Sequence, residues 1–94
     1  MASFIVRVEI LKPKARDYEE LHKALGDRGF KRSVQGPDGK EYKLPSAEYL
    51  YIGEASVEFV RDIVANTACR ATTKKFSVLV AGEEGFTFSG LELA

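Results

Sequence analysis

Residues 42–53 constrain the fold most, because their side chains alternate in character at every second position. A period of two is that of a β-strand, and it places Leu50 and Ile52 on one face and Tyr49 and Tyr51 on the other. We interpret the aliphatic face as the one turned to the core and the tyrosine face as one kept for a partner. This segment therefore predicts a sheet with helices on one face and an uncovered aromatic face.

The rest of the chain alternates between strand and helix patterns. Period-two alternation indicates strands at 4–10, 30–35, 41–52, 75–81 and 86–93, and helical spacing indicates helices at 15–28 and 56–71. Pro45 cannot donate to a ladder, so the strand around it is expected to lie at an edge, to bulge or to change phase. The order is βαββαβ with an additional C-terminal strand. It predicts an α+β, ferredoxin-like sandwich: an antiparallel sheet with two helices on one face.

Length and composition limit the organisation and the partners. The 94 residues are too few to divide, so residues 1–94 form a single domain, and 45% hydrophobic content argues against disorder. Fourteen basic and fourteen acidic side chains cancel, so any affinity for nucleic acid depends on where the charges lie. No apolar segment is long enough to insert into a membrane, and the single Cys69 forms no internal disulfide. We therefore expect a cytoplasmic protein.

Charge placement on the expected fold gives a basic end. Three connections, 12–16, 36–40 and 70–75, share one edge of the sheet if the first strand runs toward it. They carry Lys12, Lys14, Arg16, Lys40, Arg70, Lys74 and Lys75. A phosphate backbone could lie there. The alternative is that these loops are charged only because they are solvated.

His22 is the only histidine and the natural candidate for proton transfer. It follows Tyr18 by one helical turn and borders the buried stripe. With Glu19 and Lys23 beside it, an acid or base role in ribonucleolytic cleavage is one interpretation. The other is a histidine that packs or caps without catalysis.

The uncovered face of the first strand carries Arg7, where Tyr49 and Tyr51 are expected as neighbours. Aromatic rings beside an arginine stack on unpaired bases in sheet-based RNA binders. A homodimer interface, or a face sealed by the final strand, explains the same residues.

Nothing in the sequence predicts a metal or another cofactor. Cys69 has no companion at metal-ligand spacing, and the glycines do not follow the strand-to-helix order of a phosphate loop. Glu9, Glu41 and Glu48 are scattered by strand alternation, which is the usual distribution of solvated charges.

Four segments carry a resemblance to a known family. They are Phe4-Ile-Val-Arg-Val-Glu-Ile10, Tyr18-Glu-Glu-Leu-His-Lys-Ala-Leu25, Gly29-Phe30 and Tyr42-Lys-Leu-Pro-Ser-Ala-Glu-Tyr49. In these segments the chain resembles small bacterial and prophage-borne proteins grouped with the GhoS antitoxin family. The resemblance implies a ferredoxin-like fold related in architecture to small CRISPR-associated nucleases. It also implies an endoribonuclease antitoxin of a toxin-antitoxin pair, which cleaves the messenger of a membrane toxin, and it aligns His22 with an arginine implicated in that activity.

Together these observations predict a GhoS-like RNA-binding protein. The stronger version of this hypothesis is a metal-independent endoribonuclease in which His22 transfers a proton. The residues expected to bind single-stranded RNA are Arg7, Lys12, Lys14, Arg16, Tyr49, Tyr51, Lys74 and Lys75. The competing hypothesis is a non-enzymatic interaction module of phage or mobile-element origin. Such a module would self-associate through Tyr49, Tyr51, Phe59 or Ile63.

Overall fold

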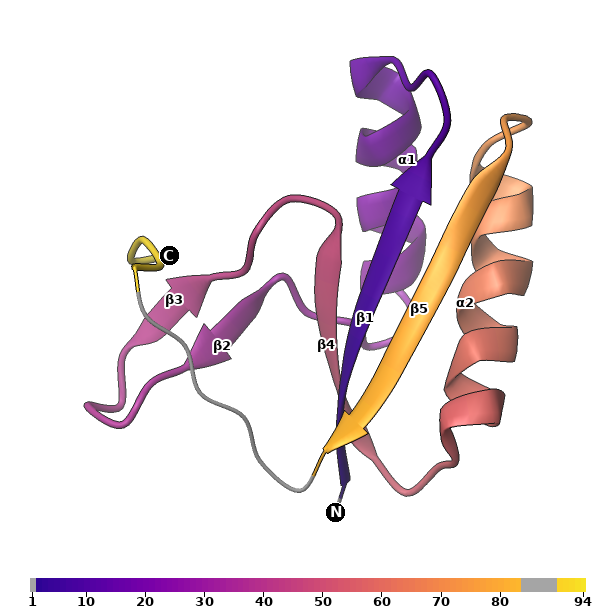
Figure 1. Cartoon of the computed structure of the whole chain (residues 1–94). Coiled ribbons are helices and arrows are strands. Elements are labelled where there is room, and N and C mark those ends of the chain that lie inside the picture. Colours follow the sequence, from indigo (N-terminus) through magenta and orange to yellow (C-terminus); the bar gives the residue numbers. More distant parts are fainter. Residues whose placement is uncertain (1, 84–89) are drawn as a thin grey trace.

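Two helices pack against one face of an antiparallel sheet in the computed structural model, which describes residues 2–83 and 90–94 (Figure 1). The elements are β1 (Ala2–Ile10), α1 (Ala15–Gly26), β2 (Ser33–Gln35), β3 (Glu41–Lys43), β4 (Glu48–Gly53), α2 (Val57–Ala71) and β5 (Phe76–Glu83). The predicted α+β class is confirmed, and this element order is compatible with a ferredoxin-like plan. Among the described residues, no helix is long and apolar enough to cross a membrane.

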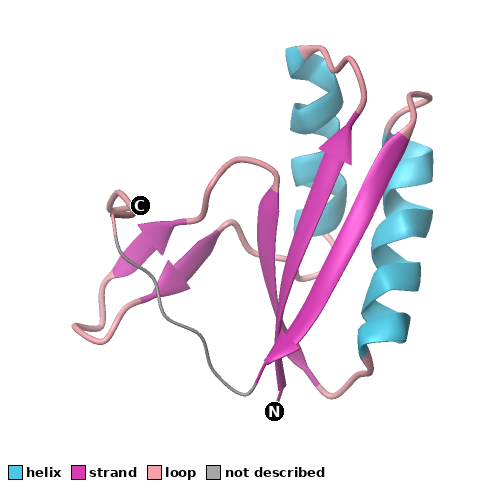
Figure 2. Ribbon diagram, in the orientation of Figure 1, coloured by secondary structure: helices cyan, strands magenta, loops and turns pink. Residues whose placement is uncertain are grey.

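The main sheet has three strands in the order β4-β1-β5, and β1 pairs antiparallel with both neighbours. β2 and β3 form a separate two-stranded ribbon that projects to one side of this sheet (Figure 2). Lys31, just before β2, forms an isolated bridge with Leu50 and so connects the ribbon to β4. The ribbon is thus held beside the sheet without extending it as a full strand.

The predicted strand 41–52 is interrupted, and Pro45 lies in the interruption. The segment 44–47 turns between β3 and β4: the Glu48 N–H donates to the Pro45 carbonyl at 3.1 Å, and Ala47 takes a left-handed backbone (φ 71°). The Ala47 carbonyl also accepts the Val8 N–H at 2.9 Å. A proline has no N–H for a ladder, so the expected disturbance takes the form of a complete break.

The core lies between the sheet and the helices. Its buried members are Phe4, Val6, Val8, Ile10, Leu21, Leu25, Phe30, Tyr49, Val60, Val64 and Ala68. Leu21 and Leu25 of α1 recur at helical spacing, as do Val60, Val64 and Ala68 of α2, and each set forms the apolar stripe of its helix. The Ser56 side chain caps α2 by accepting the Phe59 N–H at 3.0 Å, as its position before the stripe predicts.

The predicted last strand, 86–93, falls mostly outside the described residues. Its described end runs along β3: the Lys43 N–H donates to the Glu92 carbonyl at 2.7 Å, and the Ala94 N–H donates to the Glu41 carbonyl at 3.0 Å. The C-terminal residues therefore extend the ribbon on its β3 side.

Candidate nucleic-acid interface

The loop before α1 and the loop after α2 meet at one end of the molecule (Figure 1). The Leu11 N–H donates to the Lys75 carbonyl at 2.7 Å, which joins the two loops. We name this region the basic end and define it by the cationic residues of both loops and the adjoining helix termini. They are Lys12, Lys14, Arg16, Arg70, Lys74 and Lys75.

An open hollow of about 350 Å³ lies between the two loops of the basic end. Four cationic side chains line it, together with the Asp17 carboxylate and uncharged neighbours that include Thr72 and Thr73. The four are Lys14, Arg16, Arg70 and Lys74. The structure therefore brings together basic residues that are more than fifty positions apart in the chain.

Asp17 holds the two loops of the basic end together. Its carboxylate accepts three hydrogen bonds: from the Lys14 N–H at 2.8 Å, the Thr72 hydroxyl at 2.9 Å and the Lys74 ammonium at 2.5 Å. The Lys74 hydrogen bond, followed by that from Lys14, lowers the pKa of Asp17 from 3.8 to about 2. Lys74 is consequently the most neutralised cation of the hollow.

Sequence reasoning missed Asp17 and Thr72 as parts of this site. One signal was present, since Asp17 stands three residues after Lys14, the spacing at which a carboxylate reaches back to the first N–H of a helix. Thr72 had no such signal, because its hydrogen bond to Asp17 spans 55 positions.

We expect Asp17→Asn to lower the midpoint of thermal unfolding at pH 7. The pKa of Asp17 is lower in the folded state, so its ionised form stabilises the fold above about pH 4, and this stabilisation is lost as the pH falls toward 2. The difference in midpoint between wild type and variant should therefore narrow over that interval. Melting curves at stepwise lower pH measure it, with Asp62→Asn, an exposed carboxylate on α2, as the control.

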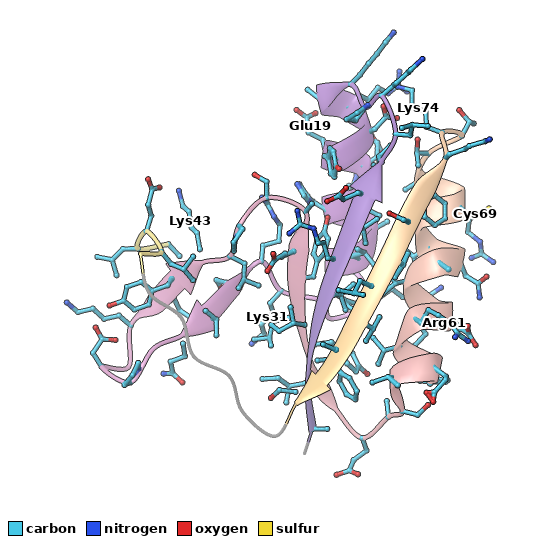
Figure 3. The ribbon with its side chains drawn as sticks, viewed as in Figure 1. Glu19, Lys31, Lys43, Arg61, Cys69 and Lys74 are labelled. Atoms are coloured by element: carbon cyan, nitrogen blue, oxygen red, sulfur yellow. The ribbon has the colours of Figure 1, made fainter. Side chains whose placement is uncertain are left out.

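The connection 36–40 does not join the basic end, so the predicted place of Lys40 was wrong. This turn forms the tip of the β2–β3 ribbon, on the far side of the molecule from Lys74 (Figure 3). The break around Pro45 is the physical reason, because it detaches the ribbon from the long strand on which the prediction depended.

His22 lies half-buried on α1, beside two tyrosines. Its Nδ1 is 2.6 Å from the Tyr49 hydroxyl, and its ring centroid is 6.0 Å from that of Tyr18. Burial first, and the charge of Arg32 second, lower the pKa of His22 below 6.5. The imidazole is thus neutral at pH 7 and is oriented by Tyr49, which fits a packing histidine.

The prediction that Tyr49 and Tyr51 face a partner was wrong. Tyr49 is 0% exposed, and Tyr51 packs against the core with its ring 4.8 Å from that of Phe30. The strand register is the reason: Tyr49 pairs with Val6 and Tyr51 with Phe4, so both rings share the helix-covered face of β1. Neither ring is presented for base stacking on the open face of the sheet.

Burial of Tyr49 is tolerated because its hydroxyl reaches His22. The same burial raises the pKa of Tyr49 to about 12, so the group stays protonated. Of the other residues expected to support self-association, Phe59 is exposed, whereas Ile63 packs against the core. Of the four residues expected to support self-association, only Phe59 is therefore exposed.

Arg7 lies on the open face of the sheet, as predicted, with different neighbours. Its guanidinium is 2.9 Å from the Glu9 carboxylate and 3.1 Å from that of Glu48, and these hydrogen bonds, Glu9 first, raise its pKa. Two carboxylates compensate the one positive charge. Arg7 is therefore expected to attract a phosphate less strongly than the cations of the basic end do.

Within residues 2–83 and 90–94, no group of three or more histidine, cysteine, aspartate or glutamate side chains is arranged to hold a metal ion. The sequence matches no protein-family model and no protein with a curated description.

Proposed function

We propose that the protein is a GhoS-like RNA-binding protein that holds single-stranded RNA at its basic end. The observation that carries this proposal is the hollow that Lys14, Arg16 and Arg70 line, between the start of α1 and the end of α2. Cations spaced around an open hollow neutralise successive phosphates and release counterions, which is the main source of nonspecific affinity for nucleic acid. The resemblance in 18–25 and 29–30 supports RNA as the polymer.

RNA cleavage is the second candidate function, and the orientation of His22 favours it. A neutral, oriented imidazole can exchange a proton at pH 7, which is what metal-independent cleavage of RNA needs. His22 stands six positions after Arg16 on α1, about 9 Å along the helix axis at 1.5 Å per residue. Six residues at 3.6 per turn also set the two side chains about 120° apart around α1, so the RNA would have to bend around the helix to bring a phosphate to His22.

We expect the triple variant Lys14→Gln, Arg16→Gln, Arg70→Gln to bind single-stranded RNA more weakly than wild type. The slope of log affinity against log salt should flatten by roughly 0.7 for each phosphate that the variant no longer neutralises. Fluorescence anisotropy with an unstructured labelled RNA measures both quantities. Lys74 stays unchanged in this variant, because its bond to Asp17 supports the fold.

The matched control is Lys31→Gln, Lys40→Gln, Lys43→Gln, which removes the same charge away from the basic end (Figure 3 labels Lys31 and Lys43). Equal salt slopes for the two triple variants would contradict binding at the basic end. The same samples, incubated with chelator and resolved on denaturing gels, test cleavage. Products that persist in His22→Gln would exclude His22 as the proton-transfer group.

A further inference from the structure

β5 forms one edge of the main sheet, and its sequence is unusually open to pairing. The strand order ends at β5, and no other strand among the described residues bonds to its outer side. Residues 76–82 contain no charged residue and no proline. Natural sheets usually protect such an edge with lysine, proline or a bulge, because unpaired N–H and C=O groups recruit another strand.

The pairing with β1 fixes which backbone groups of β5 point outward. The Leu11 N–H bonds to the Lys75 carbonyl, so residue 75 and every second residue after it turn their backbone groups to β1. The intervening residues turn their N–H and C=O groups to the free side. These residues are Phe76, Val78, Val80 and Gly82.

On the helix-covered side of the sheet, the valines of β5 are less buried than the valines of β1 with which they pair. Apolar surface is therefore left uncovered along the β5 edge. Val80 pairs with Val6 and Val78 with Val8, on the same face of the sheet. The two valines of β1 are 0% exposed, whereas those of β5 remain half-exposed. They line a groove of about 150 Å³ with Val57 and other residues of α2. On the opposite face Leu79 is 65% exposed.

We infer that β5 pairs antiparallel with β5 of a second copy of this chain, about a two-fold axis at Leu79. Residues whose numbers sum to 158 then face each other. Val78 faces Val80, and both have outward backbone groups, so this pair exchanges two hydrogen bonds. Phe76 faces Gly82, and their outward backbone groups exchange hydrogen bonds in the same way.

The choice of a second copy as the partner follows from self-complementarity. An isologous contact needs a surface that matches itself, and this register pairs Val78 with Val80, pairs Leu79 with its own copy, and uses every outward backbone group from Phe76 to Gly82. Two three-stranded sheets would thus become one continuous sheet.

Leu79 is the decisive position, because the axis sets it opposite its own copy. We expect Leu79→Lys and Leu79→Glu each to sediment as monomers at concentrations where wild type is a dimer, since like charges would face each other. An equimolar mixture of the two variants should recover the dimer. With the axis at Val78 or Val80, position 79 would face residue 77 or 81, and mixing would restore nothing.

Val80→Pro tests the backbone pairing separately. It removes an N–H that points away from β1, so the intramolecular ladder is kept while the dimer loses one hydrogen bond from each copy. We expect self-association to weaken about tenfold or more. Ile52→Lys is the control for Leu79→Lys, because it adds the same charge on the open face of β4, away from the edge.

The measurements are sedimentation velocity for association and circular dichroism for folding of every variant. A wild-type protein that stays monomeric up to its solubility limit would overturn the inference. A dimer that Ile52→Lys disrupts and Val80→Pro leaves intact would also overturn the inference. That result is expected if two copies associate through the open faces of their sheets instead of through the β5 edges. None of these outcomes depends on RNA binding, so this inference and the proposed function are tested independently.

Discussion

Replacing Tyr49 with alanine is expected to lower the free energy of unfolding by about 3 to 5 kcal/mol, the usual cost of deleting a large buried ring. Tyr49 is 0% exposed and contacts the core between Val6 and α1. The deletion leaves a cavity that the sheet and helix cannot both close. It also leaves the His22 imidazole without the hydroxyl that it bonds at 2.6 Å. Urea denaturation followed by circular dichroism measures the loss.

Two variants make this expectation specific. Tyr49→Phe keeps the ring and removes only the hydroxyl, so it should cost about 1 to 3 kcal/mol, the penalty for an unsatisfied polar partner. Ile52→Ala, on the same strand and 50% exposed, should change stability by less than about 0.5 kcal/mol. The opposite order, with Ile52 costly and Tyr49 neutral, would mean that the tyrosines face outward.

Leu21→Ala is expected to lower the free energy of unfolding by about 2 to 5 kcal/mol, the range for a buried leucine. Leu21 is 0% exposed and lies in the apolar stripe of α1, which packs against the sheet and α2. Alanine preserves the helical propensity of the site, so the loss reports packing. Chemical denaturation of the variant and wild type side by side measures it.

Lys23→Ala is the matched control for Leu21, since it lies two positions later on the exposed face of α1. Its effect should stay within about 0.5 kcal/mol. Similar unfolding midpoints for the two variants would contradict the orientation of α1. The half-buried place of His22 depends on that orientation, because His22 stands between these two residues on the helix.

The candidate site shows where local sequence information ends. The two basic loops were predictable, because Pro13 ends the first strand and the apolar stripes mark where each helix lies. The link through Asp17 was not, since its bonds to Thr72 and Lys74 span 55 and 57 positions. Lys40 was misplaced for a related reason: its position depended on a continuous strand through Pro45, and that strand is broken.

Local spacing in the chain was enough to predict the helices, most of the strands and most of the core. The features that carry this information are the alternation in 4–10, the stripe of Leu21 and Leu25, and the Ser56 cap. Which face of β4 is turned to the helices depends instead on contacts between distant segments. Alternation places the tyrosines on the face opposite Leu50 and Ile52. It does not show which of these faces is turned to the helices, since both pairs of side chains are large and mainly apolar. The register with β1, and the hydrogen-bond partner that His22 supplies to the buried hydroxyl, turn the tyrosines inward.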